Sequence, residues 1–295
     1  MLSVLVPIYN FDVTPFIKDI HNQCVQAKIN FEILLYDDFS DQAYKTINST
    51  ISELKEVTYL ELSKNYGRSK IRNRLAVDAK FNNLLFVDCD SNTEDEFYIL
   101  NYLKHLTRYK VIYGGRSYTS TPPFNNNLFL RWFYGITREV KSASNRETEP
   151  YRNFMTNNFV IDKSIILNTP FDESLNGYGY EDLLFAQELK SKGIAIHHIE
   201  NSLIHIGLES AEEFINKTAN GMKNLAKMIQ TKQIDKRIKI YRVYNKLAYL
   251  HLLWLVKIAY VIFRSTINKN LRGRRPNLKY FDLYKLYHLV IEMKS

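Results

Sequence analysis

The sequence has little cysteine and no long uninterrupted hydrophobic run. Only two of its 295 residues are cysteines, so a disulfide framework is not expected and a reducing compartment is favoured. The first residues, MLSVLVPIYN, lack the basic segment and the cleavage site of a signal peptide, so we expect no export. Hydrophobic residues make up 45% and charged residues 24%. These values exclude an intrinsically disordered chain, a collagen-like repeat and a polytopic membrane protein.

The net charge of +9 is distributed unevenly along the chain. Residues 1–210 contain 22 Lys+Arg and 26 Asp+Glu, a balance of −4, whereas residues 211–295 contain 18 and 5, a balance of +13. A tail this basic indicates a polyanionic partner, either a nucleic acid or an anionic membrane surface. The asymmetry also predicts two parts with a boundary near residue 210.

The first part alternates short apolar runs with stretches of helical spacing. The apolar runs lack a clean polar alternation, which is typical of strands buried on both faces of a parallel sheet. We therefore predict a doubly wound α/β fold, in which ligands bind at the carboxyl ends of the strands. The expected strands are 2–8, 31–36, 57–62, 84–87 and 110–114, with short late strands at 194–199 and 203–206; the expected helices are 15–27, 42–55, 68–80, 95–107 and 180–192. The Gly-, Ser-, Pro- and Asn-rich segment 115–128 is expected to be a loop, and 157–168 is a further apolar segment.

Polar residues follow four of the predicted strands, and the topology would gather them at one edge of the sheet. They are Pro7, Tyr9 and Asn10 after the first strand; Asp37, Asp38, Ser40 and Asp41 after the second; Asn65, Gly67, Arg68, Arg72 and Asn73 after the third; and Asp88 and Asp90 after the fourth.

Asp88 and Asp90 carry the sharpest chemical signal. Two carboxylates at positions i and i+2 of an extended strand end can share one divalent cation, or one can hold the metal while the other binds a ribose. A polar turn is the commoner reading of a lone D-x-D pattern. Its position directly after the buried run LLFV, where a nucleotide site is expected, favours the functional reading.

Asp38 and Arg72 are weaker candidates. Asp38 lies where a carboxylate can bind a base or a ribose, although an Asx-turn or a helix cap would explain it as well. Arg72 suits a base or pyrophosphate contact, and a solvated helix face is the equal alternative.

The second strong pattern is the run GYGYED at 177–182. The two glycines allow unusual backbone conformations and the close approach of a substrate. Glu181 and Asp182 would begin a helix, where acidic residues are common because they complement the helix dipole. A carboxylate at this turn can act as a general base toward an acceptor hydroxyl. His205, on a late strand, is a minority candidate for a metal ligand.

With these residues the chain resembles a family 2 glycosyltransferase of the GT-A fold over about residues 1–207. The matching segments occur in the family's order: VPIYN at 6–10, YDDFSD at 36–41, NYGRSKIRN at 65–73, FVDCD at 86–90 and FDESLNGYGYEDLLFAQEL at 171–189. The sequence departs from the family's commonest pattern at Phe39, where a glycine often follows the paired aspartates, and at Tyr180.

The resemblance implies an inverting transfer of a sugar from a nucleotide-diphosphate donor, most often a UDP-sugar, to a hydroxyl, with Mn²⁺ or Mg²⁺ as cofactor. It implies a nucleotide-sugar half at about 1–115 and an acceptor half at about 116–210. The implied roles are nucleotide binding by Pro7, Tyr9, Asn10, Asp38, Asn65, Gly67, Arg72 and Asp88, metal binding by Asp90, Asp88 and His205, general base by Asp182 with Glu181 beside it, and acceptor binding by Tyr178, Gly179 and Tyr180.

The basic tail, 211–295, is predicted to be helical and amphipathic. Read as one helix at 100° per residue, 238–264 places Lys239, Arg242, Lys246, Lys257 and Arg264 on one stripe beside a wide apolar face. The apolar run 247–263 would extend about 25 Å, short of a bilayer core of about 30 Å. An interfacial helix on an anionic leaflet is the favoured interpretation for 238–295, and packing against protein is the alternative.

Two other functions compete with the transferase. One is a nucleotide-sugar-binding protein without catalysis, or a nucleotidyltransferase on the same fold. The other is an RNA-binding protein, which we disfavour because the basic residues alternate with a broad apolar face. We expect a glycan or lipid-linked acceptor, no nucleic-acid partner, and a location in the cytoplasm that includes the inner face of the cytoplasmic membrane, with polysaccharide biosynthesis as the setting. A homodimer is compatible with the sequence.

Overall fold

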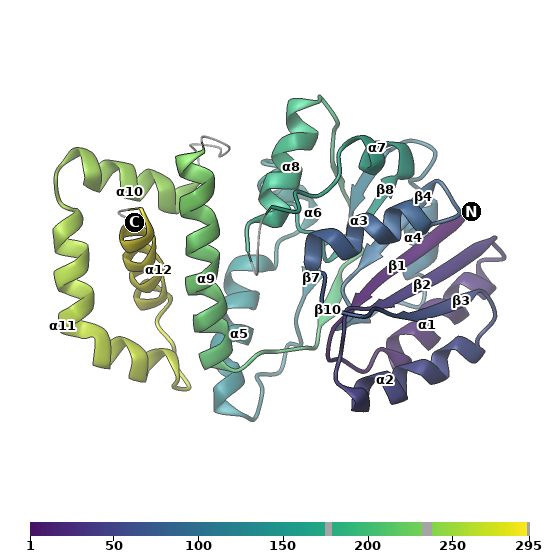
Figure 1. Ribbon diagram of the computed structural model, residues 1–295, viewed down its shortest axis with the longest axis horizontal. Coiled ribbons are helices and arrows are strands. Elements are labelled where there is room, and N and C mark those ends of the chain that lie inside the picture. The colour runs from purple at the N-terminus through teal and green to yellow at the C-terminus, as the bar shows by residue number, and fades with distance from the viewer. Residues whose placement is uncertain (175–178, 232–237, 294–295) are drawn as a thin grey trace. The chain divides into compact units, whose positions relative to one another are not determined.

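The computed structural model describes residues 1–174, 179–231 and 238–293, which form two compact units (Figure 1). The first unit comprises residues 1–119, 139–174 and 181–207. The second comprises residues 120–138, Gly179, Tyr180 and the described residues from Leu208 onward. Residues 120–138 therefore join the helical unit, although the sequence places them in the acceptor half of the first domain.

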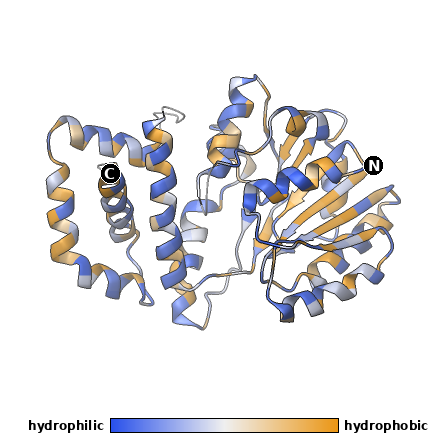
Figure 2. Cartoon of the chain, in the orientation of Figure 1, coloured by the Kyte–Doolittle hydropathy of each residue, from blue (hydrophilic) through white to orange (hydrophobic). Residues whose placement is uncertain are grey.

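A seven-stranded sheet forms the centre of the first unit, in the order β3-β2-β1-β4-β8-β6-β9. Its strands are β1 (Leu2–Ile8), β2 (Phe31–Asp37), β3 (Val57–Glu61), β4 (Asn83–Val87), β6 (Val111–Tyr113), β8 (Asn158–Asp162) and β9 (His197–His198). Strand β8 runs antiparallel to both neighbours and the other pairs are parallel. The mostly parallel sheet predicted from the sequence is confirmed, and its strands are coloured as largely hydrophobic in Figure 2.

Helices cover both faces of this sheet because β1 and β2 bury side chains on both sides. On one face, Val4 and Val6 pack with residues of α1 (Thr14–Gln26), η1 (Thr50–Glu53) and α4 (Tyr98–Leu103). On the other face, Leu5 packs with residues of α3 (Arg68–Asp78), α7 (Lys163–Asn168) and α8 (Glu181–Ser191). Helix α2 (Gln42–Ser49) precedes η1. This arrangement leaves the carboxyl ends of β1, β2 and β4 on one edge.

A small second sheet lies beyond the end of β4. It consists of β5 (Ser91–Thr93), β10 (Leu203–His205) and β7 (Arg116–Ser117), in the order β5-β10-β7. Strand β10 is antiparallel to β5, with His205 opposite Ser91, and parallel to β7, with Leu203 opposite Arg116. This pairing joins three segments that are more than a hundred residues apart at their extremes.

Some expected elements differ in extent from those observed. The helix expected at 95–107 is formed only over Tyr98–Leu103, and the apolar segment 157–168 divides into β8 and α7. The expected loop 115–128 contains β7 and a short helix, η2 (Asn126–Leu128). Three further elements follow it: α5 (Phe129–Tyr134), the π-helical turn η3 (Gly135–Glu139) and α6 (Ala143–Glu147).

The second unit is helical. Helix α9 (Ala211–Gln230) begins with a capping box, in which the Ser210 hydroxyl accepts from the amide of Glu213 and the Glu213 carboxylate accepts from the amide of Ser210. Helix α12 (Leu278–Glu292) packs against both α9 and α11 (Leu253–Leu271), as Figure 1 shows. The core of the unit is aromatic: Phe214 of α9 and Phe281 of α12 stack with ring centres 5.2 Å apart.

The tail breaks where the sequence predicted one continuous helix. Helix α10 (Lys239–Tyr249) and α11 meet at an angle of 113°. His251 takes a left-handed conformation with φ of 56°, its amide donates to the Ala248 carbonyl, and the Leu252 amide donates to the Leu247 carbonyl. This is a Schellman motif, which ends a helix. The prediction of a single basic stripe from Lys239 to Arg264 is therefore wrong, because these residues lie on two helices that point in different directions.

Within the described residues no single helix is long and apolar enough to cross a membrane, whereas α10 and α11 taken together pass that length and composition test as a bent pair.

Candidate active site

The candidate site lies at the carboxyl ends of β1, β2 and β4, where the small sheet and the first turns of α3 and α8 also meet. The residues of this carboxylate site all belong to the first unit. The predicted acceptor residues Gly179 and Tyr180 belong to the second unit and are described separately.

Asp38, after β2, fixes the start of α3. Its two carboxylate oxygens accept from the amides of Tyr66 (2.6 Å) and Gly67 (2.9 Å), and its carbonyl accepts from the Asn65 side chain (3.0 Å). Gly67 has φ of 82°, a conformation that side chains other than glycine rarely adopt, and it directly precedes α3. Burial raises the pKa of Asp38, and the two amides counteract this. The helix cap that the sequence left as an alternative is not formed, because these two amides precede the first turn of α3 and that helix has no side-chain cap.

The residues after β1 form hydrogen bonds with the loop that follows β2. The amide of Asn10 donates to the Ser40 hydroxyl (2.8 Å), and the Asn10 side chain accepts from the amide of Asp41 (2.7 Å). Tyr9 is 55% exposed, so its ring is available to a ligand, and Pro7 is the second-last residue of β1. Phe39 takes φ of 71°, a left-handed conformation that glycine adopts most readily.

Asp88 lies between two arginines at the end of β4. Its Oδ1 is 2.7 Å from Nη2 of Arg72, and its Oδ2 is 3.6 Å from Nη2 of Arg116. Arg116 also lies 3.5 Å from Glu139. The Nε atoms of Arg72 and Arg116 are buried without a hydrogen-bond partner among the described residues. Two guanidinium groups with spare donors can take the oxygens of a phosphate or a ribose.

Asp90 and His205 lie side by side because β5 and β10 pair in register. Nδ1 of His205 is 3.4 Å from Oδ2 of Asp90, and the Ile206 amide donates to the Asp90 carbonyl. Burial alone would raise the pKa of Asp90, but the charges of His205, Arg116 and Arg68 lower it well below its usual range. A Cβ on Gly207 would lie 2.5 Å from Cβ of Asp90, so only glycine fits there.

Asp90 and His205 carry atoms of the types that bind a divalent cation. Oδ1 of Asp90 and Nε2 of His205 are both buried and lack a hydrogen-bond partner among the described residues. A carboxylate oxygen and an imidazole nitrogen are ligands that Mn²⁺ accepts, and Mg²⁺ prefers the oxygen. In the described part of the chain, no group of three or more His, Cys, Asp or Glu side chains gathers for a metal, because Asp88 faces the arginines instead. Substrate oxygens would then fill the remaining coordination positions of the metal.

Asp182, in the first turn of α8, accepts a 2.6 Å hydrogen bond from the hydroxyl of Thr156 to its Oδ1. Burial raises the pKa of Asp182 to about 6, and the neighbouring charge of Glu181 contributes in the same direction. The Thr156 hydroxyl and Arg72 oppose that rise. A carboxylate that titrates near neutral pH is suited to general-base catalysis.

Glu181 is 9% exposed and its carboxylate lies 3.5 Å from Nη1 of Arg68, the first residue of α3. The Arg68 side chain is 45% exposed, so this ion pair lies at the edge of the site rather than in its interior. The pair ties the first turn of α3 to the first turn of α8.

The predicted acceptor residues are placed in the second unit as far as they are described. Gly179 has φ of 104°, and its carbonyl accepts from the Asn224 side chain of α9. Tyr180 takes φ of 72° and packs with the cluster of α9 that includes Met222. Tyr178 lies outside the described residues.

Sequence reasoning missed three residues of this site. Arg116 lies in the segment 115–128, Glu139 is the last residue of η3, and Thr156 precedes β8; none belongs to a recognisable pattern. Ser40 was expected at this edge without an assigned role, and its hydroxyl accepts from the Asn10 amide. Only the pairing of β7 with β10 explains the position of Arg116.

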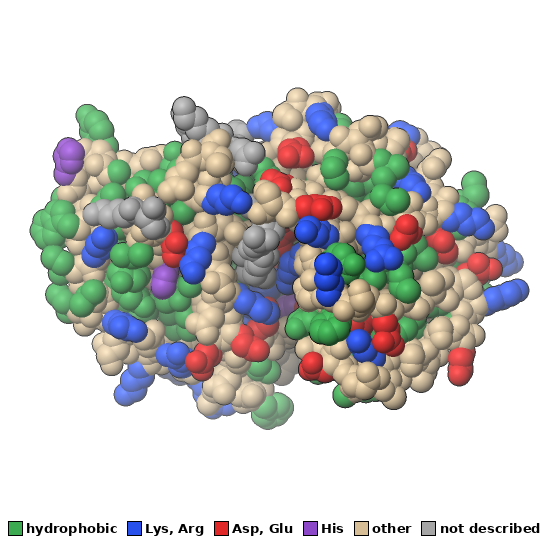
Figure 3. Space-filling model, viewed as in Figure 1, with side chains coloured by type: hydrophobic (Ala, Val, Ile, Leu, Met, Phe, Trp, Pro, Cys, Tyr) green, Lys and Arg blue, Asp and Glu red, His purple; other side chains and the backbone are tan. Residues whose placement is uncertain are grey.

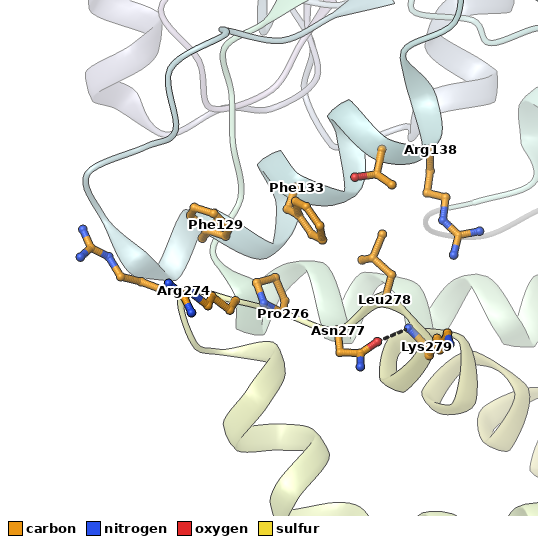
Figure 4. Close-up of a pocket in the computed structure, with 10 residues that line it drawn as sticks. Phe129, Phe133, Arg138, Arg274, Pro276, Asn277, Leu278 and Lys279 are labelled. Carbon is orange, nitrogen blue, oxygen red and sulfur yellow. Dashed lines mark hydrogen bonds between the residues drawn. The ribbon is translucent and has the colours of Figure 1, made fainter.

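A cavity of about 600 Å³ lies elsewhere, in the second unit (Figure 4). It is lined by Phe129, Phe133 and Pro276 and by basic side chains that include Arg274 and Lys279. It shares no residue with the carboxylate site, so it is not the donor site considered above.

Comparisons with known proteins agree with this fold. Residues 3–171 match the family described as "Glycosyl transferase family 2". A chondroitin synthase of Pasteurella multocida (strain Pm70) is 25% identical over 297 residues, covering 87% of this chain and 30% of that protein. The chain thus spans less than a third of the length of this relative.

Solved structures share the fold at low sequence identity. A mannosyltransferase of Pyrobaculum calidifontis, solved with GDP-Man and Mn²⁺, has a TM-score of 0.61 at 13% identity, covering 99% of this chain and 85% of its own. S. aureus TarS has a TM-score of 0.51 at 19% identity, covering 77% of this chain and 39% of its own. A glucosyl-3-phosphoglycerate synthase of Mycobacterium tuberculosis, solved with Mg²⁺ and UDP, has a TM-score of 0.54 at 12% identity. The match covers 80% of this chain and 81% of that one.

The family match covers more than half of the chain and includes the strand ends that carry Asp38, Arg72, Asp88 and Asp90. The chain belongs to glycosyl transferase family 2.

Proposed function

We propose that the protein transfers a sugar from a nucleotide-diphosphate donor, with a UDP-sugar as the first choice, to a hydroxyl of a glycan or lipid-linked acceptor with inversion at the anomeric carbon. The observation that carries the proposal is the placement of Asp182. It is a half-buried carboxylate with a pKa of about 6, held by Thr156 and separate in sequence from the strand-end groups that would take the donor.

The donor would bind at the ends of β1, β2 and β4. Arg72 and Arg116 offer guanidinium donors to its phosphate or ribose oxygens, and Tyr9 offers an exposed ring. Asp90 and His205 would hold Mn²⁺ or Mg²⁺, which neutralises charge on the diphosphate leaving group when bound. Neighbouring folds solved with UDP, GDP-Man, Mg²⁺ or Mn²⁺ support this assignment.

Asp182 would remove the proton from the acceptor hydroxyl as the oxygen attacks the anomeric carbon. The oxygen–carbon bond forms while the bond from that carbon to the phosphate oxygen breaks, and the nucleoside diphosphate leaves with the electron pair. One displacement from the opposite face inverts the configuration. Glu181, tied to Arg68, would keep the first turn of α8 in place beside the base.

The acceptor would be a growing glycan or a lipid-linked saccharide, made in polysaccharide biosynthesis. Two observations support this acceptor class: the sequence similarity to a chondroitin synthase, and the basic second unit. Gly179 and Tyr180 would contact it.

A panel of UDP- and GDP-sugars, incubated with Mn²⁺ and saccharide acceptors, tests the proposal by release of nucleoside diphosphate and by the anomeric configuration of the product. We expect an inverted product and at least a thousandfold loss of rate in Asp182→Asn, with donor binding by calorimetry within about twofold of the parent protein. Asn replaces the carboxylate with an amide of the same shape, so this variant serves as its own structural control. A product of retained configuration, or an Asp182→Asn variant that loses donor binding as well, would contradict the role of Asp182.

A further inference from the structure

Helix α11 exposes a row of large apolar side chains, which we call the apolar ridge. The ridge consists of Trp254, Leu255, Ile258, Val261 and Ile262. Their exposed fractions lie between 42% and 67%, which is high for five large apolar side chains within nine residues. Figure 3 shows hydrophobic side chains gathered over α11 at the left of the view.

The ridge occupies one side of the helix. At 100° per residue its five members fall within about 120° of arc. The opposite side of α11 packs inward at Val256, Tyr260 and Ile267, which are buried, and Tyr260 stacks on Tyr287 of α12 with ring centres 4.0 Å apart. Phe263, at the border of that side, is 52% exposed. Folding of the second unit therefore already uses the inner face of α11, and the ridge is a second, separate apolar face.

Basic residues continue the same side of the helix. Lys269 and Arg272 lie about 60° and 0° from Trp254 around the axis, and both are exposed. The surrounding sequence is basic throughout: residues 238–281 contain ten Lys or Arg and no Asp or Glu. Helix α10, bent by 113° from α11, exposes Lys239, Arg242 and Lys246.

We propose that the apolar ridge docks the protein on an anionic lipid bilayer, with α11 lying in the interface and the ridge side chains inserted among the acyl chains. Lys269 and Arg272 meet the anionic headgroups on the same side. An amphipathic helix with an apolar face containing Trp, bordered by cations, has the composition of interfacial membrane-binding helices. The ridge shares no residue with the carboxylate site, so membrane binding can be tested independently of the transfer reaction.

Charge favours the bilayer over the other occupants. A second copy of the chain seated on this face would place cations of one copy near cations of the other, and such contacts are unfavourable. A nucleic acid would satisfy the cations but leave five apolar side chains in water. An anionic bilayer satisfies both features of the face.

Vesicle flotation of the full chain tests the proposal, with phosphatidylcholine vesicles compared with vesicles that contain about one third phosphatidylglycerol. We expect binding to the anionic vesicles, release at about 1 M salt because charges are then screened within about 3 Å, and little binding to the neutral ones. Ile258→Glu with Ile262→Glu should lower the vesicle partition coefficient at least tenfold. Lys269→Gln and Arg272→Gln should each lower it about fivefold on anionic vesicles, since each cation near the surface contributes about 1 kcal/mol.

Val77→Glu is the matched control, because Val77 is an equally exposed apolar residue (60%) on α3 of the first unit. It should bind vesicles like the parent protein. Trp254 gives a second measurement: its emission should shift to shorter wavelength on anionic vesicles, whereas Trp132 is 6% exposed and already buried.

Unchanged flotation of the Ile258→Glu, Ile262→Glu variant would overturn the proposal, as would the absence of any Trp254 shift in the parent protein. A dimer of the parent protein that this variant abolishes, together with no vesicle binding, would instead identify the ridge as a contact between copies. Salt-sensitive retention of RNA without vesicle binding would reject the bilayer in favour of nucleic acid.

Discussion

Replacing Thr156 by valine should move the acid limb of the pH–rate profile. Thr156 is 3% exposed, and its hydroxyl donates a 2.6 Å hydrogen bond to the carboxylate of Asp182. That bond stabilises the ionised carboxylate and so lowers the pKa of Asp182 against the effect of burial. Valine has nearly the same shape and no hydroxyl, so the variant removes the hydrogen bond and leaves the packing.

The expected size of the shift follows from the strength of the bond. A hydrogen bond to a charged group contributes about 1.5–3 kcal/mol, and one pKa unit corresponds to about 1.4 kcal/mol. Because water can replace part of the lost bond, we expect a rise of about one unit, from about 6 to about 7. At pH 6 the ionised fraction of Asp182 would then fall from about one half to about one tenth.

The assay is kcat/KM for nucleoside diphosphate release between pH 5 and pH 9, with the donor that the sugar panel identifies. General-base catalysis requires the ionised carboxylate, so the rate of the parent protein should rise with pH through about 6. Thr156→Val should be about fivefold slower at pH 6 and nearly equal at pH 9. Thr156→Ser keeps the hydroxyl and should retain the parent profile.

An acid limb that stays near pH 6 in Thr156→Val would show that the Thr156 hydroxyl does not set the ionisation of Asp182. A uniform loss of rate at every pH would also refute that role of the hydroxyl, since that pattern indicates displaced geometry rather than a changed proton affinity.

Two further predictions concern the donor side of the site. Gly207→Ala should weaken activation by Mn²⁺ about tenfold or more, because the new Cβ would lie 2.5 Å from Cβ of Asp90 and must displace it; a metal titration measures this, and an unchanged midpoint would contradict the close approach. Arg72→Gln should weaken donor binding and lower the free energy of unfolding by about 2 kcal/mol, because the 2.7 Å ion pair with Asp88 is lost. Calorimetry and urea unfolding measure the two effects, and unchanged values in both would remove Arg72 from the site.

The strand-end residues could be predicted because a parallel sheet brings its carboxyl ends together whatever the intervening sequence. That rule places Asp38, Asp88 and Asp90 at one edge of the sheet. The rule does not predict which side chains each of these aspartates contacts. Asp88 faces Arg72 and Arg116, whereas Asp90 faces His205, and this division depends on the register of β5, β10 and β7.

Short elements and single hydrogen bonds could not be predicted. Strand β7 has two residues, so no periodicity marks it, and Arg116 was hidden in a segment whose composition indicates a loop. The break after α10 rests on His251 in a left-handed conformation, where the expected signal would have been glycine or asparagine. Without that signal, the pattern of Lys and Arg suggested a single long helix.

Calorimetric titration with UDP and GDP, each with and without Mn²⁺, tests the central claim most directly. We expect one of the two nucleotides to bind with micromolar affinity in Mn²⁺, and Asp90→Ala to abolish the metal-dependent part of that binding. Gly273→Ala should bind like the parent protein, because Gly273 is remote from the carboxylates in sequence and its nearest new contacts lie at 3.3 Å or more. Folded protein that binds neither nucleotide in the presence of Mn²⁺, or an Asp90→Ala variant that binds as tightly as the parent, would contradict the account.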